Sequence, residues 1–256
     1  MSNNPVLFHS ELAMAQARLG KFDAALQAAA RALNFATDND KLKVRSLRVR
    51  ILAQAEKYDE AENECQAMLK EYSGPGDVVE IRYHLSNVYS ASRQMAKAEQ
   101  QLEILLKSDP ANATINNDLG YIWADQNKNL DKAEEMIRHA IESDRRRRQL
   151  SRHASADGDQ DNAAYLDSLG WVLFRRGQLD EACRQLELAS SLPEGADDPT
   201  VWDHLGDVYF RQQRYDQAKS VWEKSAHLFE TEKRRKMDER YKEIRRKLKA
   251  LETVQK

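Results

Sequence analysis

The chain has 256 residues, of which 41% are hydrophobic and 32% are charged, and its formal net charge is −2. This balance excludes a polycation or a polyanion as a whole, and the scarcity of glycine (9) and proline (5) favours long solvated helices. The two cysteines lie far apart in sequence, which argues against a disulfide framework and for a reduced compartment.

The first ten residues have neither the basic region nor the apolar region of a signal peptide. No apolar run in the sequence approaches the roughly 18 residues that a membrane helix requires. These features predict a cytoplasmic protein that does not enter the membrane.

From residue 6 onward, small and large residues recur with a period close to 34 residues. Such a period is typical of stacked helix pairs, in which each pair buries its apolar face against its neighbours. The six predicted repeats are residues 6–39, 42–75, 79–112, 113–147, 163–196 and 199–232. Each has a small residue where its second helix packs: Ala25, Ala61, Ala98, Ala133, Ala182 and Ala218.

The repeats follow this pattern to different degrees. The second is the weakest match, because Arg48 and Val49 stand where other repeats have a leucine and a small residue. In five of the six repeats an aspartate precedes the small residue by two positions, where it can accept hydrogen bonds in the first turn of a helix. These aspartates are Asp23, Asp59, Asp131, Asp180 and Asp216.

The sixth repeat carries the fullest version of the pattern. Its residues share one face of a first helix and one face of a second helix. They are Leu205, Gly206 and Tyr209, then Ala218, Trp222 and Ala226. With Trp202 they form W-x2-L-G-x2-Y followed by A-x3-W-x3-A, which resembles the tetratricopeptide repeat (TPR). The fifth repeat, YLDSLGWVLFRRGQLDEA, is similar to those of bacterial TPR arrays.

The resemblance extends over all six repeats, about 204 of the 256 residues, and leaves out the segment between the fourth and fifth repeats and the residues after 232. It implies an all-α fold, a right-handed α-solenoid of antiparallel helix pairs. In this family the first helices line a concave groove that holds peptide segments of partner proteins.

Residues 148–162 form a polar insertion between the fourth and fifth repeats, and the fifth repeat begins about 16 residues later than the period predicts. One interpretation is a lengthened helix that runs into a solvated loop, which a solenoid tolerates on its surface. The other is a basic partner-binding patch at Arg145–Arg148 with Arg152, next to which Ser151 is a candidate modification site.

Residues 233–256 follow the last repeat and predict a basic amphipathic helix, with eleven Lys or Arg against four Asp or Glu. Its apolar residues recur at steps of three and four: Met237, Tyr241, Ile244, Leu248 and Leu251. We expect this stripe to cap the last repeat while the outer face stays in water. The alternatives are a basic surface for acidic partners or nucleic acid, and a short coiled-coil helix.

No motif for catalysis, nucleotide binding or zinc-dependent hydrolysis occurs in the sequence. His84 and His204 are both expected on groove-lining helices, but three repeats separate them, roughly 30 Å, too far to share a metal ion. Cys65 and Cys183 fall at or beside packing positions, where cysteine acts as a small apolar residue. We therefore expect no catalytic residue, no cofactor and no metal site.

In the TPR family, positions 2, 5, 6, 9, 12 and 13 of each first helix face the groove. Carried onto this sequence, they predict a set of partner-binding residues. These are Tyr83, His84, Asn87, Asn117, Asp118, Tyr121, Asp125, Asp167, Trp171, Arg175, Asp203, His204, Asp207, Phe210 and Arg211. The second repeat offers Lys43, Ser46, Arg50 and Gln54 at the same positions.

Three aromatic residues in this set, Tyr121, Trp171 and Phe210, are expected to be exposed among aspartates. Exposed aromatic side chains beside carboxylates favour a partner peptide with apolar anchors and basic residues. The alternative is that these rings pack between the helices.

TPR domains that bind the C-terminal tails of chaperones share a clamp of lysine, asparagine and arginine residues. At the clamp positions counted from the first repeat, this chain has Ser10, Met14, Leu47, Glu80 and His84. No other starting repeat fits better, so a chaperone-tail adaptor is not expected.

The sequence thus predicts a non-enzymatic scaffold that binds a partner peptide or helix in the concave groove. One alternative is a nucleic-acid or polyanion binder that uses Arg145–Arg148 and the basic C-terminal helix. Another is an assembly segment of a larger bacterial TPR protein. Self-association is also open, because an uncapped first repeat leaves an apolar end face.

Overall fold

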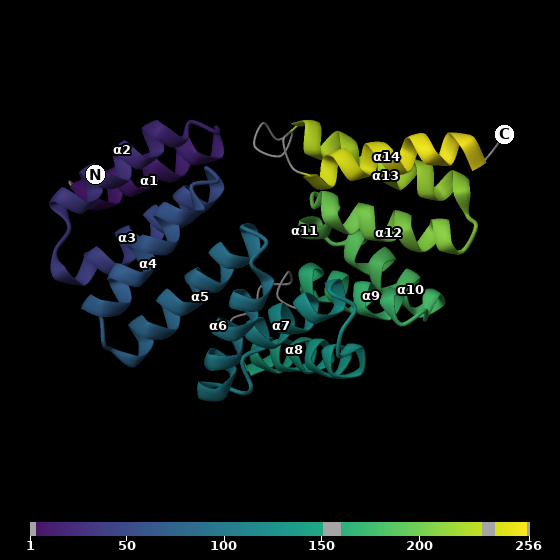
Figure 1. Cartoon of the computed structure of the whole chain (residues 1–256), viewed down its shortest axis with the longest axis horizontal. Helices are drawn as coiled ribbons and strands as arrows, with labels where there is room; N and C mark the ends of the chain where they lie inside the picture. The colour runs from purple at the N-terminus through teal and green to yellow at the C-terminus, as the bar shows by residue number, and fades with distance from the viewer. Residues whose placement is uncertain (1–3, 151–159, 232–238, 255–256) are drawn as a thin grey trace. The chain divides into compact units, whose positions relative to one another are not determined.

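The computed structural model describes residues 4–150, 160–231 and 239–254, and these residues form fourteen helices (Figure 1). The helices are α1 (Pro5–Arg18), α2 (Phe22–Phe35), α3 (Asp38–Gln54), α4 (Tyr58–Glu71), α5 (Pro75–Ala91), α6 (Met95–Ser108), α7 (Ala113–Asp125), α8 (Leu130–Leu150), α9 (Ala163–Arg175), α10 (Leu179–Ser191), α11 (Pro193–Ala196), α12 (Pro199–Arg211), α13 (Tyr215–Thr231) and α14 (Glu239–Val254). The helices pack in pairs, which confirms the predicted all-α solenoid.

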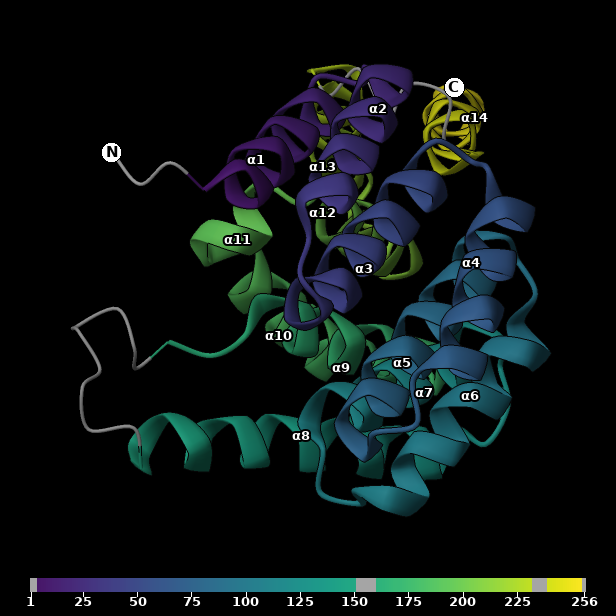
Figure 2. The same cartoon turned by 90° about the vertical axis from the view of Figure 1, so that its left-hand side faces the viewer.

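The chain divides into two compact units, Met1–Ser108 and Asp109–Lys256, which we name the N-terminal unit and the C-terminal unit. In the N-terminal unit α1 pairs with α2, α3 with α4 and α5 with α6, and Figure 2 shows the first two pairs side by side. In the C-terminal unit α7 pairs with α8, α9 with α10 and α12 with α13, and α14 packs on α13. The repeat boundaries given above remain a prediction.

One turn geometry joins the two helices of every pair. A residue with positive φ, between 56° and 77°, is followed by a residue whose N–H donates to the carbonyl five positions earlier. This is the Schellman helix end, in which glycine avoids the strain that other residues meet. The residues at this place in the six turns are Gly20, Glu56, Arg93, Asn127, Gly177 and Gln213, and the turn between α7 and α8 has a second residue with positive φ, Asn129 at 48°.

Four first helices begin at an asparagine or aspartate cap. The side-chain oxygen accepts a hydrogen bond of 2.8–3.2 Å from a backbone N–H in the first turn of α1, α7, α9 or α12. These bonds satisfy N–H groups that the helix itself leaves free. The capping residues are Asn4, Asn112, Asn162 and Asp198.

The glycine of the Leu-Gly pair allows the two helices of a pair to touch. A Cβ atom on Gly206 would lie 2.3 Å from Nε1 of Trp222, and one on Gly170 would lie 2.4 Å from Cγ of Leu186. Such distances are far below van der Waals contact. A side chain larger than that of glycine at this position would therefore clash with the second helix at the observed separation of the two helices.

The structure differs from the predicted segments in two places. The helix α8 continues to Leu150, so the predicted insertion begins as helix, and α11 is a short extra helix before α12. Ser151 and Arg152 lie outside the described residues, as does Met237 at the start of the predicted C-terminal helix. Among the described helices, none has the length and apolar character that crossing a membrane requires.

Candidate partner-binding surface

The predicted partner-binding residues all lie on first helices of the pairs. Those of the third repeat lie on α5, and the others lie on α7, α9 and α12 of the C-terminal unit. We name this side of each unit its first-helix surface. The two units present it differently, and they are described separately.

Five of the predicted residues are buried in the C-terminal unit, where successive first helices pack directly against each other. The expectation that Trp171 is exposed is wrong, since only 8% of it is accessible. Tyr121 and Phe210 are half-buried. The rings of Tyr121 and Trp171 lie beside His204 of α12, and Phe210 lies beside Tyr215 and Trp222 of α13, so the rings pack between helices, as in the alternative interpretation. The buried residues are Asn117, Asp167, Trp171, Asp203 and His204.

His204 of α12 lies at the centre of this contact. Its Nδ1 atom is 2.9 Å from Oδ1 of Asp167 on α9, and its ring stacks on Trp171 with centroids 4.2 Å apart. The centroid of the Tyr121 ring, on α7, lies 6.3 Å from the centroid of the His204 ring. Burial acts to lower the pKa of His204, but the carboxylates of Asp167 and Asp203 outweigh it and raise the pKa above its usual value.

Two buried polar atoms in this region have no hydrogen-bond partner among the described residues. They are Nε1 of Trp171 and Oδ1 of Asn117. The face of Trp171 is covered by the guanidinium of Arg175, 5.6 Å from the ring centroid. Burial, reinforced by nearby aspartates and opposed by Arg240, raises the pKa of the Tyr121 hydroxyl. The contact between these helices is therefore closed to solvent and contains aromatic rings together with buried polar groups, some paired, such as His204 with Asp167, and some without a partner in the described part of the chain.

Two of the predicted aspartates, Asp203 and Asp207, are paired with a lysine of the same chain. Nζ of Lys247 on α14 lies 2.8 Å from Oδ1 of Asp203 and 2.7 Å from Oδ1 of Asp207. Burial raises the pKa of Asp207 to about 6, with Lys247 opposing and Asp203 reinforcing the rise. Burial acts to lower the pKa of Lys247, but the two carboxylates outweigh it and raise the pKa. The sequence favours a basic residue of a partner beside these aspartates, but in the structure Lys247 of α14 takes this place.

The N-terminal unit leaves its first-helix surface open. Position 9 of the first helices carries Met14, Arg50 and Asn87, which are all exposed, on α1, α3 and α5. The same position in the C-terminal unit carries Tyr121, Trp171 and Asp207, which are half-buried or buried.

We name Met14, Arg50 and Asn87 the open row. Polar contacts hold the side chains that lie beside it. Oγ of Ser46 donates to Oε1 of Glu80 at 2.7 Å, and Nε2 of His84 lies 3.7 Å from the same oxygen. Burial lowers the pKa of His84. Arg50 makes no hydrogen bond or ion pair with any residue that the structure describes, so its guanidinium is available. Tyr83 and His84, on the same helix as Asn87, are half-buried.

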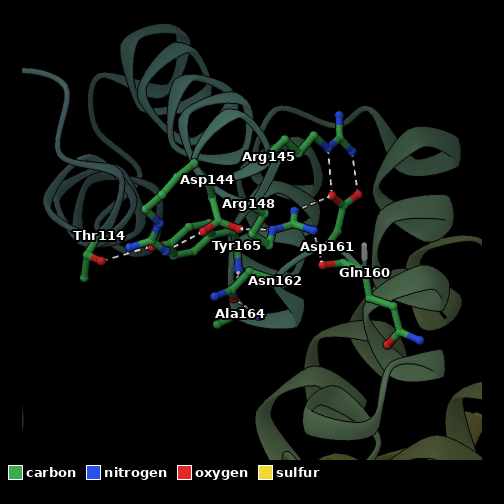
Figure 3. Close-up of polar contacts among 10 residues, drawn as sticks. Thr114, Asp144, Arg145, Arg148, Gln160, Asp161, Asn162, Ala164 and Tyr165 are labelled. Carbon is green, nitrogen blue, oxygen red and sulfur yellow. Dashed lines mark hydrogen bonds and ion pairs between the residues drawn. The ribbon is translucent and has the colours of Figure 1, made fainter. Parts of the chain in front are cut away.

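The arginine run at the end of α8 is neutralised within the chain (Figure 3). Arg145 donates two hydrogen bonds, of 2.7 and 2.5 Å, to the carboxylate of Asp161. Arg147 and Arg148 both bind the buried Asp144, at 2.7 and 3.0 Å. These pairs tie the two ends of the predicted insertion together.

The neighbouring pairs complete this neutralisation. Arg148 also lies 3.2 Å from Asp161, and Arg146 lies 2.6 Å from Glu142. A polyanion would have to break these pairs to reach the guanidinium groups. The arrangement therefore favours a structural role for Arg145–Arg148.

The other candidates for chemistry are buried or scattered. Burial raises the pKa of the Cys65 thiol to about 12 and that of Cys183 to about 11, so neither sulfur is an activated nucleophile. In the part of the chain that the structure describes, no three His, Cys, Asp or Glu side chains are grouped so that they could hold a metal ion.

Models of the tetratricopeptide repeat match residues 6–31, 83–148, 163–187 and 199–228, which together make up more than half of the chain. The TPR repeat-containing protein PA4667 of Pseudomonas aeruginosa is 31% identical over 127 residues, covering 48% of this chain. The matched region spans only 18% of that relative's length.

Two solved structures share the fold. A tetratricopeptide repeat protein from Parabacteroides merdae superimposes with a TM-score of 0.58 at 15% identity, covering 96% of this chain and 98% of that one. Yeast Tom70 superimposes with a TM-score of 0.58 at 20% identity, covering 90% of this chain and 43% of that one. At these identities the likeness concerns the fold alone.

Proposed function

Because the chain belongs to the tetratricopeptide repeat family, whose members mediate protein–protein interactions, we propose that it is a non-enzymatic scaffold that binds a segment of a partner protein on its first helices. The binding surface we assign is the open row of the N-terminal unit, formed by Met14, Arg50 and Asn87. In the C-terminal unit, Asp203 and Asp207 of the first-helix surface are already paired with Lys247 of α14.

The observation that carries this proposal is the exposure of position 9 on three successive first helices. In the C-terminal unit this position is taken up by packing between helices, whereas in the N-terminal unit it offers three different chemistries to solvent. A row of exposed side chains on neighbouring rigid helices is a suitable template for one partner segment.

The row defines the chemistry of the segment it would bind. An unpaired guanidinium such as that of Arg50 binds a carboxylate with two parallel hydrogen bonds. The amide of Asn87 can donate to and accept from a peptide backbone, and Met14 adapts to an apolar side chain. We therefore assign a segment with one acidic residue and one apolar anchor.

A site-specific cross-link tests this assignment. A photoreactive amino acid is placed at Asn87, and in a matched variant at Lys70, which is exposed on the second helix α4. We expect a partner protein to be covalently captured through position 87 and not through position 70. Equal capture at the two positions, or capture at position 70 alone, would contradict the assignment.

A further inference from the structure

The helix α14 rests on the C-terminal unit through one stripe of side chains and through hydrogen bonds from Arg240 to Thr200 on α12, at 3.1 Å, and from the Tyr241 hydroxyl to Glu230 on α13, at 2.6 Å. The side chains of Ile244 and Leu251 are buried, and the ammonium of Lys247 lies between two carboxylates. The ring of Tyr241 lies 6.3 Å from that of Phe229 on α13. These residues follow the spacing of one helical face, so α14 presents a single stripe to the unit.

The surface under this stripe combines apolar and acidic groups. Asp203 and Asp207 stand one helical turn apart on α12, and Trp222 and Phe229 are almost fully buried on α13. Lys247 lies 5.7 Å from the centroid of the Trp222 ring, so its charge is held by both carboxylates and by the aromatic face.

The helix α14 is held by fewer buried residues than its neighbours. Among its side chains that the structure describes, two are buried, Ile244 and Leu251, whereas α12 has eight buried residues and α13 has five. Elements with few buried contacts open at a lower free energy than the rest of a structure. Opening of α14 would leave two carboxylates and a tryptophan without their partner, which is a surface ready for a second helix of the same chemistry.

We propose that this surface is an exchangeable helix-binding site, at which α14 is displaced by a basic amphipathic helix of a partner protein. The partner helix carries a lysine with an apolar residue three positions before it and another four positions after it, as Ile244, Lys247 and Leu251 do. The inference extends the proposed scaffold function, on which it rests, to a second class of partner.

Charge complementarity selects this occupant. When α14 leaves, the carboxylates of Asp203 and Asp207 lose the ammonium that faces them, so the vacated site attracts a basic helix and repels an acidic segment. The i, i+4 spacing of Asp203 and Asp207 lies along one helix face, which suits a side chain approaching from a helix packed alongside. The packing of α14 on α13, with Ile244 and Leu251 buried, shows that a helix fits this surface.

The experiment uses the full chain and a fluorescent peptide with the sequence of residues 239–254. Three chains are compared: the natural one, Lys247→Met and Lys242→Gln. Lys247→Met removes the ammonium but keeps an alkyl side chain beside Trp222. Lys242→Gln is the matched control, because Lys242 is exposed and pairs with Glu239 on α14 itself. Circular dichroism verifies that each variant is folded.

A tethered helix competes at a high effective concentration, so weakening it should make the site available to a peptide in solution. We expect the peptide to bind Lys247→Met at least tenfold more tightly than the natural chain or Lys242→Gln. A peptide with Lys247→Gln should bind the Lys247→Met chain at least tenfold more weakly than the natural peptide. Hydrogen exchange in residues 239–254 of the chain should accelerate when the natural peptide is added in excess.

Three results would overturn the proposal. The first is that the natural peptide binds all three chains with equal affinity. The second is that the two peptides bind the Lys247→Met chain with equal affinity. The third is that the natural chain dimerises and hydrogen exchange in α14 of both copies stays slow, because the occupant of the site would then be a second copy of the chain. The photocross-link at Asn87 is independent of this site. If the cross-link at Asn87 captures no partner while the peptide exchanges with α14 as expected, only the assignment of the partner to the N-terminal unit is rejected.

Discussion

Asp167 and His204 share a hydrogen bond of 2.9 Å inside the contact between α9 and α12, where both side chains are buried. They come from successive repeats, 37 positions apart in the sequence. The bond therefore joins two repeats of the C-terminal unit through their first helices, and it makes the stability of this unit dependent on protonation.

The direction of that dependence follows from the raised pKa of His204. Since the folded pKa lies above the value of 6.5 of the unfolded chain, protonated His204 contributes stability that is complete below pH 6.5. This contribution is lost as the pH rises through the folded pKa. We expect His204→Asn to lower the free energy of unfolding more at pH 5.5 than at pH 9.

Tryptophan fluorescence during chemical denaturation measures this effect, because all four tryptophans lie in the C-terminal unit. The control is His139→Asn, since His139 is exposed on α8. The same loss of stability at both pH values for His204→Asn would show that the pair with Asp167 does not carry the effect.

Two tyrosines hold matching positions in the two units. The hydroxyl of Tyr209 donates to Glu187 at 2.8 Å beneath the guanidinium of Arg214, and Tyr89 donates to Glu62 at 2.8 Å beneath Lys97. Each bond connects a first helix to the second helix of the preceding pair.

We expect Tyr209→Phe to lower the free energy of unfolding of the C-terminal unit by about 1–2 kcal/mol, because a hydrogen bond to a carboxylate is lost while the ring stays in place. Denaturation followed by tryptophan fluorescence measures the change. Tyr241→Phe, which removes an exposed bond to Glu230, should cost much less. Equal costs for the two variants would disprove the role given to the partly buried bond between Tyr209 and Glu187.

The glycines of the Leu-Gly pairs give a steric prediction. Gly206→Ala places a methyl group 2.3 Å from Nε1 of Trp222, so α12 and α13 must separate. We expect a loss of about 1–3 kcal/mol, which is typical of overpacking. In contrast, a Cβ atom on Gly76 in the first turn of α5 meets no atom within 4 Å, so Gly76→Ala should be neutral or stabilising.

Thermal unfolding followed by circular dichroism compares these two variants. Equal melting temperatures for Gly206→Ala and the natural chain would mean that the two helices can separate without cost. That result would remove the physical reason for the glycine in the repeat pattern.

The helix pairs could be predicted from the sequence because their signals are local. Gly206 and Trp222 are 16 residues apart, and the spacing of small and large residues within one repeat already specifies their contact. The six turns follow from the same period, although Glu56, Arg93 and Gln213 adopt a backbone conformation that favours glycine, and their residue types gave no sign of it.

The surface was harder to predict, because it depends on contacts between repeats. The position of Trp171 in its helix is compatible with exposure or with packing, and only the close approach of α12 with His204 decides between them. Likewise Lys247 and Asp203 are 44 positions apart. Their opposite charges are visible in the sequence, but the route of the chain that joins them is not.

The same limit applies to Arg145–Arg148. A run of arginines indicates a basic surface when it is considered alone, and Asp161 on the far side of the insertion gives no local signal of pairing. The open row of the N-terminal unit was visible only in part. Arg50 and Asn87 were placed on the groove by the family pattern, whereas their exposure depends on how tightly α1, α3 and α5 pack.

The binding affinity of the captured partner segment for Arg50→Glu tests the central claim most directly. The matched variant is Lys70→Glu, which makes the same change of charge on the exposed face of α4. We predict that Arg50→Glu weakens binding at least tenfold, measured by titration calorimetry, while Lys70→Glu leaves the affinity unchanged. Equal affinities of the two variants would contradict the assignment of the partner to the first helices of the N-terminal unit.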